Sequence, residues 1–308
     1  MTMHQTFDAQ AALGFVVNQT SHIEREVNET VYPDIQYPRL IPVDTSAHPW
    51  AQTVTYYSSD KYGQAGWING NAGDIPLAGS ERAQHKTAVH MAGVGYGFGM
   101  EEVQHAQMLG INLTADDAMA ARRAYEEFVD GVALRGDDEK GLDGLLDHSA
   151  ITPAGATTGD WSTATEDQML ADVNDALYVS YGTTKQTTLA DTLLLPFARI
   201  NKLATTRLGD TSQTLLQFLR ANNTYTAISG QPLLMVGVRG LETAGVGDTA
   251  RMVAYRRSPQ VLKLHIPMPH RFLPPFQKTP LYTEVPGIFR LGGLDIRRPA
   301  EVVYRDGI

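Results

Sequence analysis

The chain has 308 residues, of which 43% are hydrophobic, and this length suits one large domain or two modest ones. Asp and Glu outnumber Lys and Arg by 34 to 25, and the resulting net charge of -9 disfavours general binding to nucleic-acid phosphates. The absence of cysteine excludes disulfides, thiolate metal sites and cysteine nucleophiles. No apolar run reaches about 18 residues, and Met1–Gln5 lacks the basic start of a signal peptide. We therefore expect no membrane partner.

Residues 1–48 are predicted to form an extended arm. Pro33, Pro38 and Pro42 forbid a continuous helix, which leaves only Ile23–Val31 for a short helical piece. An arm of this kind cannot bury its apolar residues locally. The arm either stays disordered or lies across another surface, and we expect the second.

Residues 49–94 are predicted to form a long hairpin. Val54–Tyr57 and His85–Met91 have the β-branched and aromatic content of strands, and Gly63–Gly79 forms an irregular tip. A lone hairpin is marginal in water, so this one needs a partner surface, and a neighbouring copy is the simplest. The candidate inter-subunit contact residues are the hairpin aromatics Tyr56, Tyr57, Tyr62 and Trp67.

Four alternating glycines follow the hairpin, at Gly93, Gly95, Gly97 and Gly99. The dinucleotide-binding fingerprint requires glycine at offsets of zero, two and five, and Phe98 occupies the third position. The glycines are therefore predicted to act as a hinge between the hairpin and the helices that come next.

Two helices are predicted after this hinge. The first covers Met100–Leu109 and ends at Gly110. The second begins near Thr114 and runs to about residue 134, with apolar residues spaced by three and four along one face. At about 1.5 Å per residue, the second helix is a rod of about 30 Å.

The remainder predicts an α+β arrangement with no internal repeat. Helices are expected at Thr165–Tyr181, from Pro196 to about Thr206, and from an Asp210 cap through Arg220. The expected strands are Leu189–Leu195, Leu233–Val238, Arg251–Arg256 and Leu262–Ile266, before a C-terminal stretch in which strands alternate with tight turns.

The search for chemistry finds no complete constellation. Glu102 and His105 share a helix face as in di-iron proteins, but those sites need a second such motif and two further glutamates. Asp137–Glu139 is typical of a solvated turn. Arg256 and Arg257 are too few for a nucleic-acid footprint and are candidates for pairing with carboxylates across a subunit contact. We assign no catalytic residue, no cofactor-binding residue and no metal ligand, and we expect no cofactor.

The order of elements, together with several short stretches, resembles the Hong Kong 97-type fold of tailed-bacteriophage major capsid proteins, which encapsulin nanocompartments share. The resemblance covers nearly the whole chain. The stretches that carry it are Trp50–Asp60, Gly66–Ile68, Asn71–Pro76, Gly95–Phe98, Ala133–Asp137, Gly141–Leu146, Leu193–Pro196, Arg251–Tyr255 and Pro267–Phe272.

The resemblance implies a division of the chain. An N-terminal arm covers 1–48, and the hairpin at 49–94 corresponds to the extended E-loop. Residues 95–146 belong to the peripheral domain with its spine helix. Residues 147–250 form the α+β axial domain, and 251–308 return through the peripheral domain.

The resemblance also implies a function. The chain is expected to assemble with itself into pentamers and hexamers of an icosahedral head shell, which encloses packaged double-stranded DNA without sequence-specific binding. Portal, scaffold and decoration proteins are the expected further partners, with assembly in the host cytoplasm and the virion as the final location. An encapsulin-type shell that holds a cargo enzyme is the alternative, and neighbouring genes would discriminate the two. An enzyme is disfavoured because no catalytic constellation is complete.

Overall fold

The computed structural model describes residues 32–67, 77–109 and 113–308. The chain divides into residues 1–34 and 35–308. Tyr32–Asp34 have no regular secondary structure, and the helical piece predicted at Ile23–Val31 lies outside the described residues. Within the described ranges, no helix has the length and apolar character needed to cross a bilayer.

Residues 35–44 pack against the rest of the second unit. Tyr37–Leu40 form the short helix α2, and Val43–Asp44 form strand β1, which pairs in parallel with β12 (Leu262–His265). The prediction that any helical piece of the arm is confined to Ile23–Val31 is wrong, because α2 is helical. Pro38 is tolerated because it lies in the first helical turn. The N–H of Tyr37, which has no partner inside the helix, donates to Asp130 Oδ1 at 2.8 Å.

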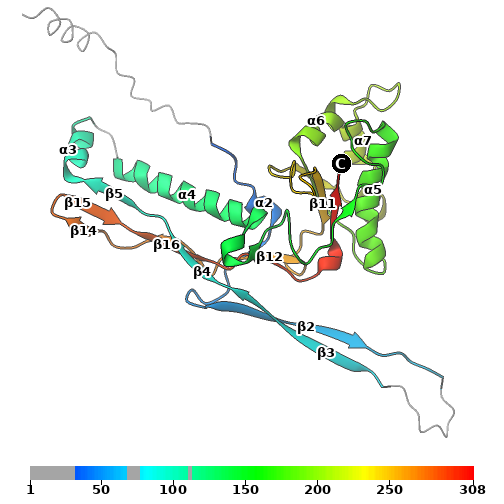
Figure 1. Ribbon diagram of the computed structural model, residues 1–308, viewed down its shortest axis with the longest axis horizontal. Coiled ribbons are helices and arrows are strands. Elements are labelled where there is room, and N and C mark those ends of the chain that lie inside the picture. The colour runs from blue at the N-terminus through cyan, green and yellow to red at the C-terminus, as the bar shows by residue number, and fades with distance from the viewer. Residues whose placement is uncertain (1–31, 68–76, 110–112) are drawn as a thin grey trace, which may run out of the picture. The chain divides into compact units, whose positions relative to one another are not determined.

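The predicted long hairpin is present. Strands β2 (Thr53–Tyr62) and β3 (Gly79–Ala88) pair over ten residues in antiparallel register. The strand predicted across His85–Met91 is interrupted at Val89, which is buried and whose N–H donates to Gln52 O at 2.9 Å. In Figure 1 the hairpin projects from the rest of residues 35–308, and no other element covers the outer halves of β2 and β3.

Both helices predicted after the hairpin are confirmed. Helix α3 spans Met100–Leu109, and α4 spans Leu113–Arg135. The face of α4 with apolar residues spaced by three and four buries Tyr125, Val129 and Val132, as that spacing predicts. After α4 the chain makes a tight turn through β6 (Gly136–Asp137), η1 (Asp138–Lys140) and β7 (Leu142–Asp143).

Helix α4 packs on a pair of three-stranded antiparallel sheets, β13-β16-β4 and β14-β15-β5. The ring of Tyr125 on α4 meets the ring of Phe289 on β16 edge to face at 4.8 Å. Both sheets use the same three chain segments, and two of these segments change sheet at Gly95 and Pro286. The strands are β4 (His90–Gly93), β5 (Tyr96–Gly99), β13 (Met268–Phe272), β14 (Phe276–Thr279), β15 (Tyr282–Val285) and β16 (Gly287–Leu291).

A five-stranded mixed sheet with the order β10-β9-β11-β18-β8 forms the centre of the remaining region. Helices lie against this sheet, as Figure 1 shows for α5, α6 and α7. The strands are β8 (Ala154–Gly155), β9 (Thr192–Leu195), β10 (Leu234–Gly237), β11 (Arg251–Tyr255) and β18 (Val302–Asp306). The helices are α5 (Glu166–Thr183), α6 (Phe197–Thr205), α7 (Leu215–Ala221) and α8 (Thr224–Ser229).

Side chains along each strand of this sheet point alternately to its two faces, and each face borders its own hydrophobic core. Leu193 and Met252 join the core under helices α5, α6 and α7. Leu194 and Val253, their chain neighbours, join the core that contains α4. Because both faces of this sheet are covered, its central strands are continuous apolar runs, of which Leu193–Leu195 is an example.

Most element predictions in this region are confirmed to within a few residues, but the expected Asp210 cap is wrong. Helix α7 begins after Thr214, whose hydroxyl accepts from Gln217 N while the Gln217 side chain accepts from Thr214 N. This reciprocal pair satisfies two N–H groups at the helix start, whereas Asp210 stands in the preceding turn. Helix α8 was not predicted. Strands β1, β12 and β17 (Leu294–Ile296) form a third three-stranded sheet, in the order β1-β12-β17. The short 3-10 helix η2 (Pro299–Glu301) follows β17 in the chain.

Candidate assembly surfaces

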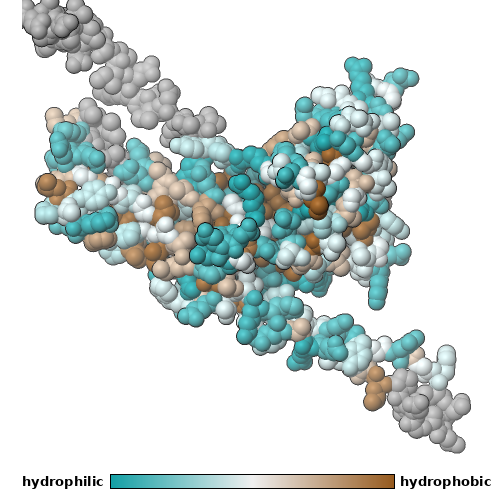
Figure 2. All heavy atoms as spheres, viewed as in Figure 1, coloured by the Kyte–Doolittle hydropathy of each residue, from teal (hydrophilic) through white to brown (hydrophobic). Residues whose placement is uncertain are grey.

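The hairpin exposes aromatic side chains that its own chain does not cover. Neither β2 nor β3 contains a buried residue. Tyr57 is 68% exposed, Tyr62 is 58% exposed, and Trp67 is fully exposed. Figure 2 shows the rest of the ribbon as mainly hydrophilic or neutral on its visible face. Exposed aromatic groups on a two-stranded ribbon mark a candidate contact surface, since such a ribbon has no core to stabilise it.

Tyr56 lies nearer to its own chain than the other hairpin aromatics. Its ring stacks on that of His85, with 4.7 Å between the ring centroids. On its own chain, the Arg297 guanidinium also lies 4.6 Å from the Tyr56 ring centroid. Burial and the negative charge of Asp295 raise the pKa of Tyr56. Tyr56 therefore attaches the first half of the hairpin to its own body, and its role toward a second copy remains a prediction.

Charged side chains gather beside this attachment. His265, which is 2% exposed, lies between two carboxylates, with Nε2 3.5 Å from Asp295 and Nδ1 3.9 Å from Asp44. Burial opposes ionisation of both carboxylates. Hydrogen bonds from Ser46 and the Lys263 ammonium nevertheless lower the pKa of Asp44. The pKa of Asp295 is likewise lowered, by hydrogen bonds from His265 and Arg297. The cluster joins β1, β12 and β17.

The four glycines after the hairpin lie in or beside paired strands. A Cβ at Gly93 would come within 2.7 Å of Gly287 O, and one at Gly95 would overlap the Val285 carbonyl oxygen. A Cβ at Gly97 would overlap the Tyr282 hydroxyl, whereas Gly99 has only the Glu102 side chain nearby, at 3.6 Å. The first two positions thus require glycine for close strand approach, because the atoms they face belong to the backbone. The role of the four glycines as a hinge remains a prediction.

Arg256 and Arg257 both have partners within the chain. Arg256 lies 3.8 Å from the buried carboxylate of Glu301. Arg257 donates from Nη2 to Pro38 O at 3.2 Å, and its backbone N–H donates to Asp191 Oδ1 at 2.7 Å. Because their side chains are not fully engaged, a contact of either arginine with a second copy stays a prediction.

The most connected buried ion is Arg251, a residue that the sequence analysis did not single out. Its guanidinium donates to both carboxylate oxygens of Asp306, at 2.6 and 2.9 Å, and to Leu146 O at 2.8 Å. It also pairs with Asp147 at 2.9 Å and lies 4.6 Å from the ring centroid of Tyr304. This network ties the turn after α4 to β11 and β18.

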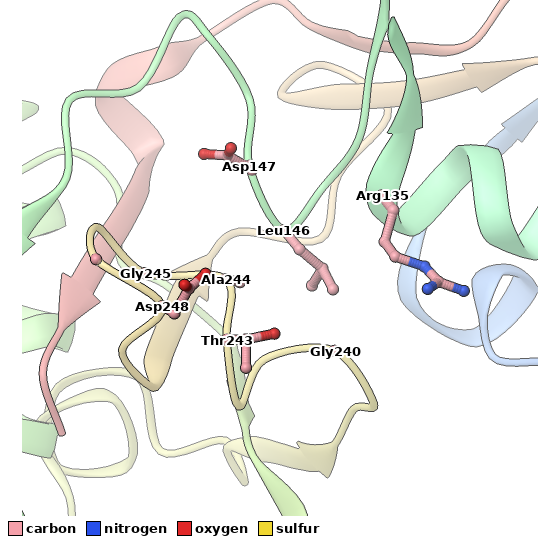
Figure 3. A pocket seen from close by; sticks show the side chains of 9 residues that line it. Arg135, Leu146, Asp147, Gly240, Thr243, Ala244, Gly245 and Asp248 are labelled. Atoms are coloured by element: carbon pink, nitrogen blue, oxygen red, sulfur yellow. The ribbon is translucent and has the colours of Figure 1, made fainter.

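A hollow of about 380 Å³ lies beside this network, between the turn at Asp147 and the loop Gly240–Asp248. Figure 3 shows that the carboxylates of Asp147 and Asp248 do not converge and that the Arg135 guanidinium points away from both. The lining therefore lacks the converging polar groups of a catalytic or ligand site.

The acidic motifs noted in the sequence have local structural roles. Glu102 accepts the N–H of Gly99 at 3.0 Å, which caps the start of α3. Asp137 accepts the N–H of Lys140 and opens the short η1 turn. Across residues 32–67, 77–109 and 113–308, no three His, Asp or Glu side chains converge as metal ligands would.

An exposed hairpin, a long helix on narrow antiparallel sheets and a helix-covered five-stranded sheet together define the shell-building class with the Hong Kong 97-type fold. The family model for the major capsid protein matches residues 63–308, so the chain belongs to the major capsid protein family. It is a capsid structural protein and not an enzyme, and its place is in the virion capsid.

Solved capsid structures share this fold over nearly the full chain. The capsid protein of Myoviridae phage XM1 has a TM-score of 0.79 at 17% identity, covering 94% of this chain and 98% of that one. A protein of the native GTA particle capsid has a TM-score of 0.68 at 10% identity, covering 98% and 99%. A chain of Mycobacterium phage Bobi gives 0.62 at 13% identity, covering 96% and 97%. No curated protein sequence matched. The predicted α+β fold of Hong Kong 97 type is confirmed.

Proposed function

We propose that this protein assembles into pentamers and hexamers of itself and that these close into an icosahedral head shell around packaged double-stranded DNA. Membership of the major capsid protein family supports a shell. The observation that carries the proposal is the ten-pair hairpin with no buried residue, which needs a second surface. Closed shells arise when repeated head-to-tail contacts of identical subunits close on themselves.

In this proposal the E-loop hairpin, residues 49–94, lies over the adjacent subunit. Tyr57, Tyr62 and Trp67 enter that contact, because aromatic side chains contribute the largest share of energy in many interfaces. Tyr56 holds the hairpin to its own subunit. Arg256 and Arg257 face carboxylates of the adjacent subunit at the edge of the contact.

The remaining parts take the roles that the fold family implies. Residues 95–146 and 251–308 form the peripheral domain, with α4 as the spine helix, and 147–250 form the axial domain that meets its copies around five-fold and six-fold axes. The glycines at 93, 95, 97 and 99 allow the hairpin to take different angles in pentamers and hexamers. Residues 35–44 of the predicted arm, 1–48, pack on their own chain, and only the rest of the arm is proposed to extend to a neighbouring surface.

The contents of the shell are held without specific recognition. A net charge of -9 disfavours a wall that grips phosphates, and this suits a container that is filled with DNA under force. Portal, scaffold and decoration proteins complete the particle in the host cytoplasm.

Electron microscopy of the purified, overexpressed protein tests the proposal. The full chain is expected to form closed shells. Replacing Tyr57, Tyr62 and Trp67 together by serine should abolish closed shells, since exposed side chains contribute little to the fold but hot-spot aromatics each contribute about 2 kcal/mol or more to a contact. The matched control replaces the same three residues by phenylalanine, which retains aromatic area. Closed shells from the serine variant would refute the contact assignment, and their absence from the full chain would refute the function.

A further inference from the structure

Arg290 lies at the root of the hairpin and holds both of its ends. It is in β16 and is only 7% exposed. Nη1 donates to Pro49 O at 3.2 Å, just before β2, and Nη2 donates to Val89 O at 3.3 Å, directly after β3. A single guanidinium thus contacts the chain on its way into the hairpin and on its way out.

The bonding of this buried cation is incomplete. Its Nε is buried without a hydrogen-bond partner, and among the described residues the hydrogen bonds of its side chain go to carbonyl oxygens with no carboxylate in an ion pair. Burying a guanidinium without a counter-charge is unfavourable, and an apolar side chain of similar volume often gives an equally stable core. Stability of the fold is therefore a poor explanation for an arginine here.

The geometry of the donors offers a better explanation. Arginine presents its N–H groups in a rigid planar fork, which fixes two acceptors at once, whereas lysine directs its donors from one atom. The two chain segments at the root of the hairpin are also joined by a backbone hydrogen bond, in which the Val89 N–H donates to Gln52 O at 2.9 Å. On the entering side, Trp50 adds a distant contact with the Arg271 guanidinium, 5.9 Å from its ring centroid. Arg290 is thus the main side-chain link from Pro49 to the sheet.

We propose that Arg290 is a positioning residue that sets the direction in which the hairpin leaves the body. Its clamp makes the hairpin and the sheet β13-β16-β4 move as one piece. Since the hairpin of one copy covers the next, its angle fixes the angle between neighbouring subunits. This last step rests on the proposed function, whereas the clamp itself does not.

Hydrogen exchange of unassembled subunits tests the clamp. In Arg290→Met, amides of Thr53–Tyr57 and Gln84–Val89 should exchange about tenfold faster, equivalent to about 1.4 kcal/mol. Amides of β9 and β11 should keep their rates. Arg290→Lys, which retains the charge but reaches one carbonyl at a time, should give a smaller acceleration at the same amides. Arg122→Met, at an exposed position on α4, is the matched control and should leave the hairpin unchanged.

Unchanged hairpin exchange in Arg290→Met, or equal acceleration in every strand, would overturn the proposal. If Arg290→Met does not fold, Arg290→Lys decides the question by the same measurement. In electron micrographs, Arg290→Lys shells should show a broader spread of diameters than wild-type shells. A wild-type chain that forms no shells while its Arg290 variants loosen the hairpin would separate failure of the proposed function from failure of the clamp.

Discussion

Replacing Arg251 by methionine should be among the most damaging single changes to the fold. Arg251 is 1% exposed, and its main partner Asp306 is 8% exposed. The methionine retains much of the volume but removes donors to Asp306, Leu146 O and Asp147. Among the described residues, the Asp306 carboxylate then keeps a hydrogen bond only from the backbone N–H of Val246, at 2.9 Å. Breaking a buried pair by removing one ion costs about 3–5 kcal/mol, because the remaining charge is left uncompensated.

Urea denaturation of unassembled subunits, followed by tryptophan fluorescence, measures this loss. Trp161 is fully buried beside the five-stranded sheet and reports on that region. The double variant Arg251→Met, Asp306→Leu removes both ions and should be less destabilised than Arg251→Met alone. A loss below about 1 kcal/mol in the single variant, or losses that simply add in the double variant, would show that Arg251 and Asp306 are not coupled as described.

Three further results are expected from the same denaturation assay. Gly131→Ala should stabilise the fold by about 0.5–1 kcal/mol, since α4 leaves open space around this helical glycine. Gly95→Ala should destabilise it by about 1–3 kcal/mol through overlap with strand β15, and the opposite ranking of the two variants would contradict the packing described. Asp44 and Asp295 have lower pKa values in the folded chain than in the unfolded one, so their contribution is present above about pH 4 and is lost as the pH falls. Asp44→Asn should flatten this acid dependence, and an unchanged slope would count against the cluster.

Local signals predicted the long elements well. Helix α4 combines acidic residues near its start with a regular apolar face, so its bounds could be placed to within one residue. The ten-pair hairpin followed from β-branched and aromatic strands around a glycine-rich tip. The short helices α2 and α8, of four and six residues, have too few turns for periodicity to register.

The contact residues were harder to predict, because their roles depend on which distant parts of the chain lie beside them in the fold. Alternating glycines suggest flexibility in sequence, but Gly95 lies against a carbonyl of a strand about 190 residues further along the chain. Arg251 and Arg290 stand in otherwise apolar strands, and nothing in the sequence distinguishes a buried clamp from an arginine on an exposed strand face. Their acceptors, including Leu146 O and Pro49 O, are backbone atoms, which carry no residue-type signal.

The proposed function depends on the completion of the hairpin, residues 49–94, by another copy of the chain. Replacing Gly63–Ala78 by Asn-Gly keeps the pairing of Tyr62 with Gly79 and closes the ribbon with a favourable two-residue turn. Electron microscopy of this variant, beside a denaturation curve that confirms its fold, is the most direct test. The variant is expected to give a folded subunit that makes no closed shells, whereas intact closed shells would contradict the completion of the hairpin by another copy.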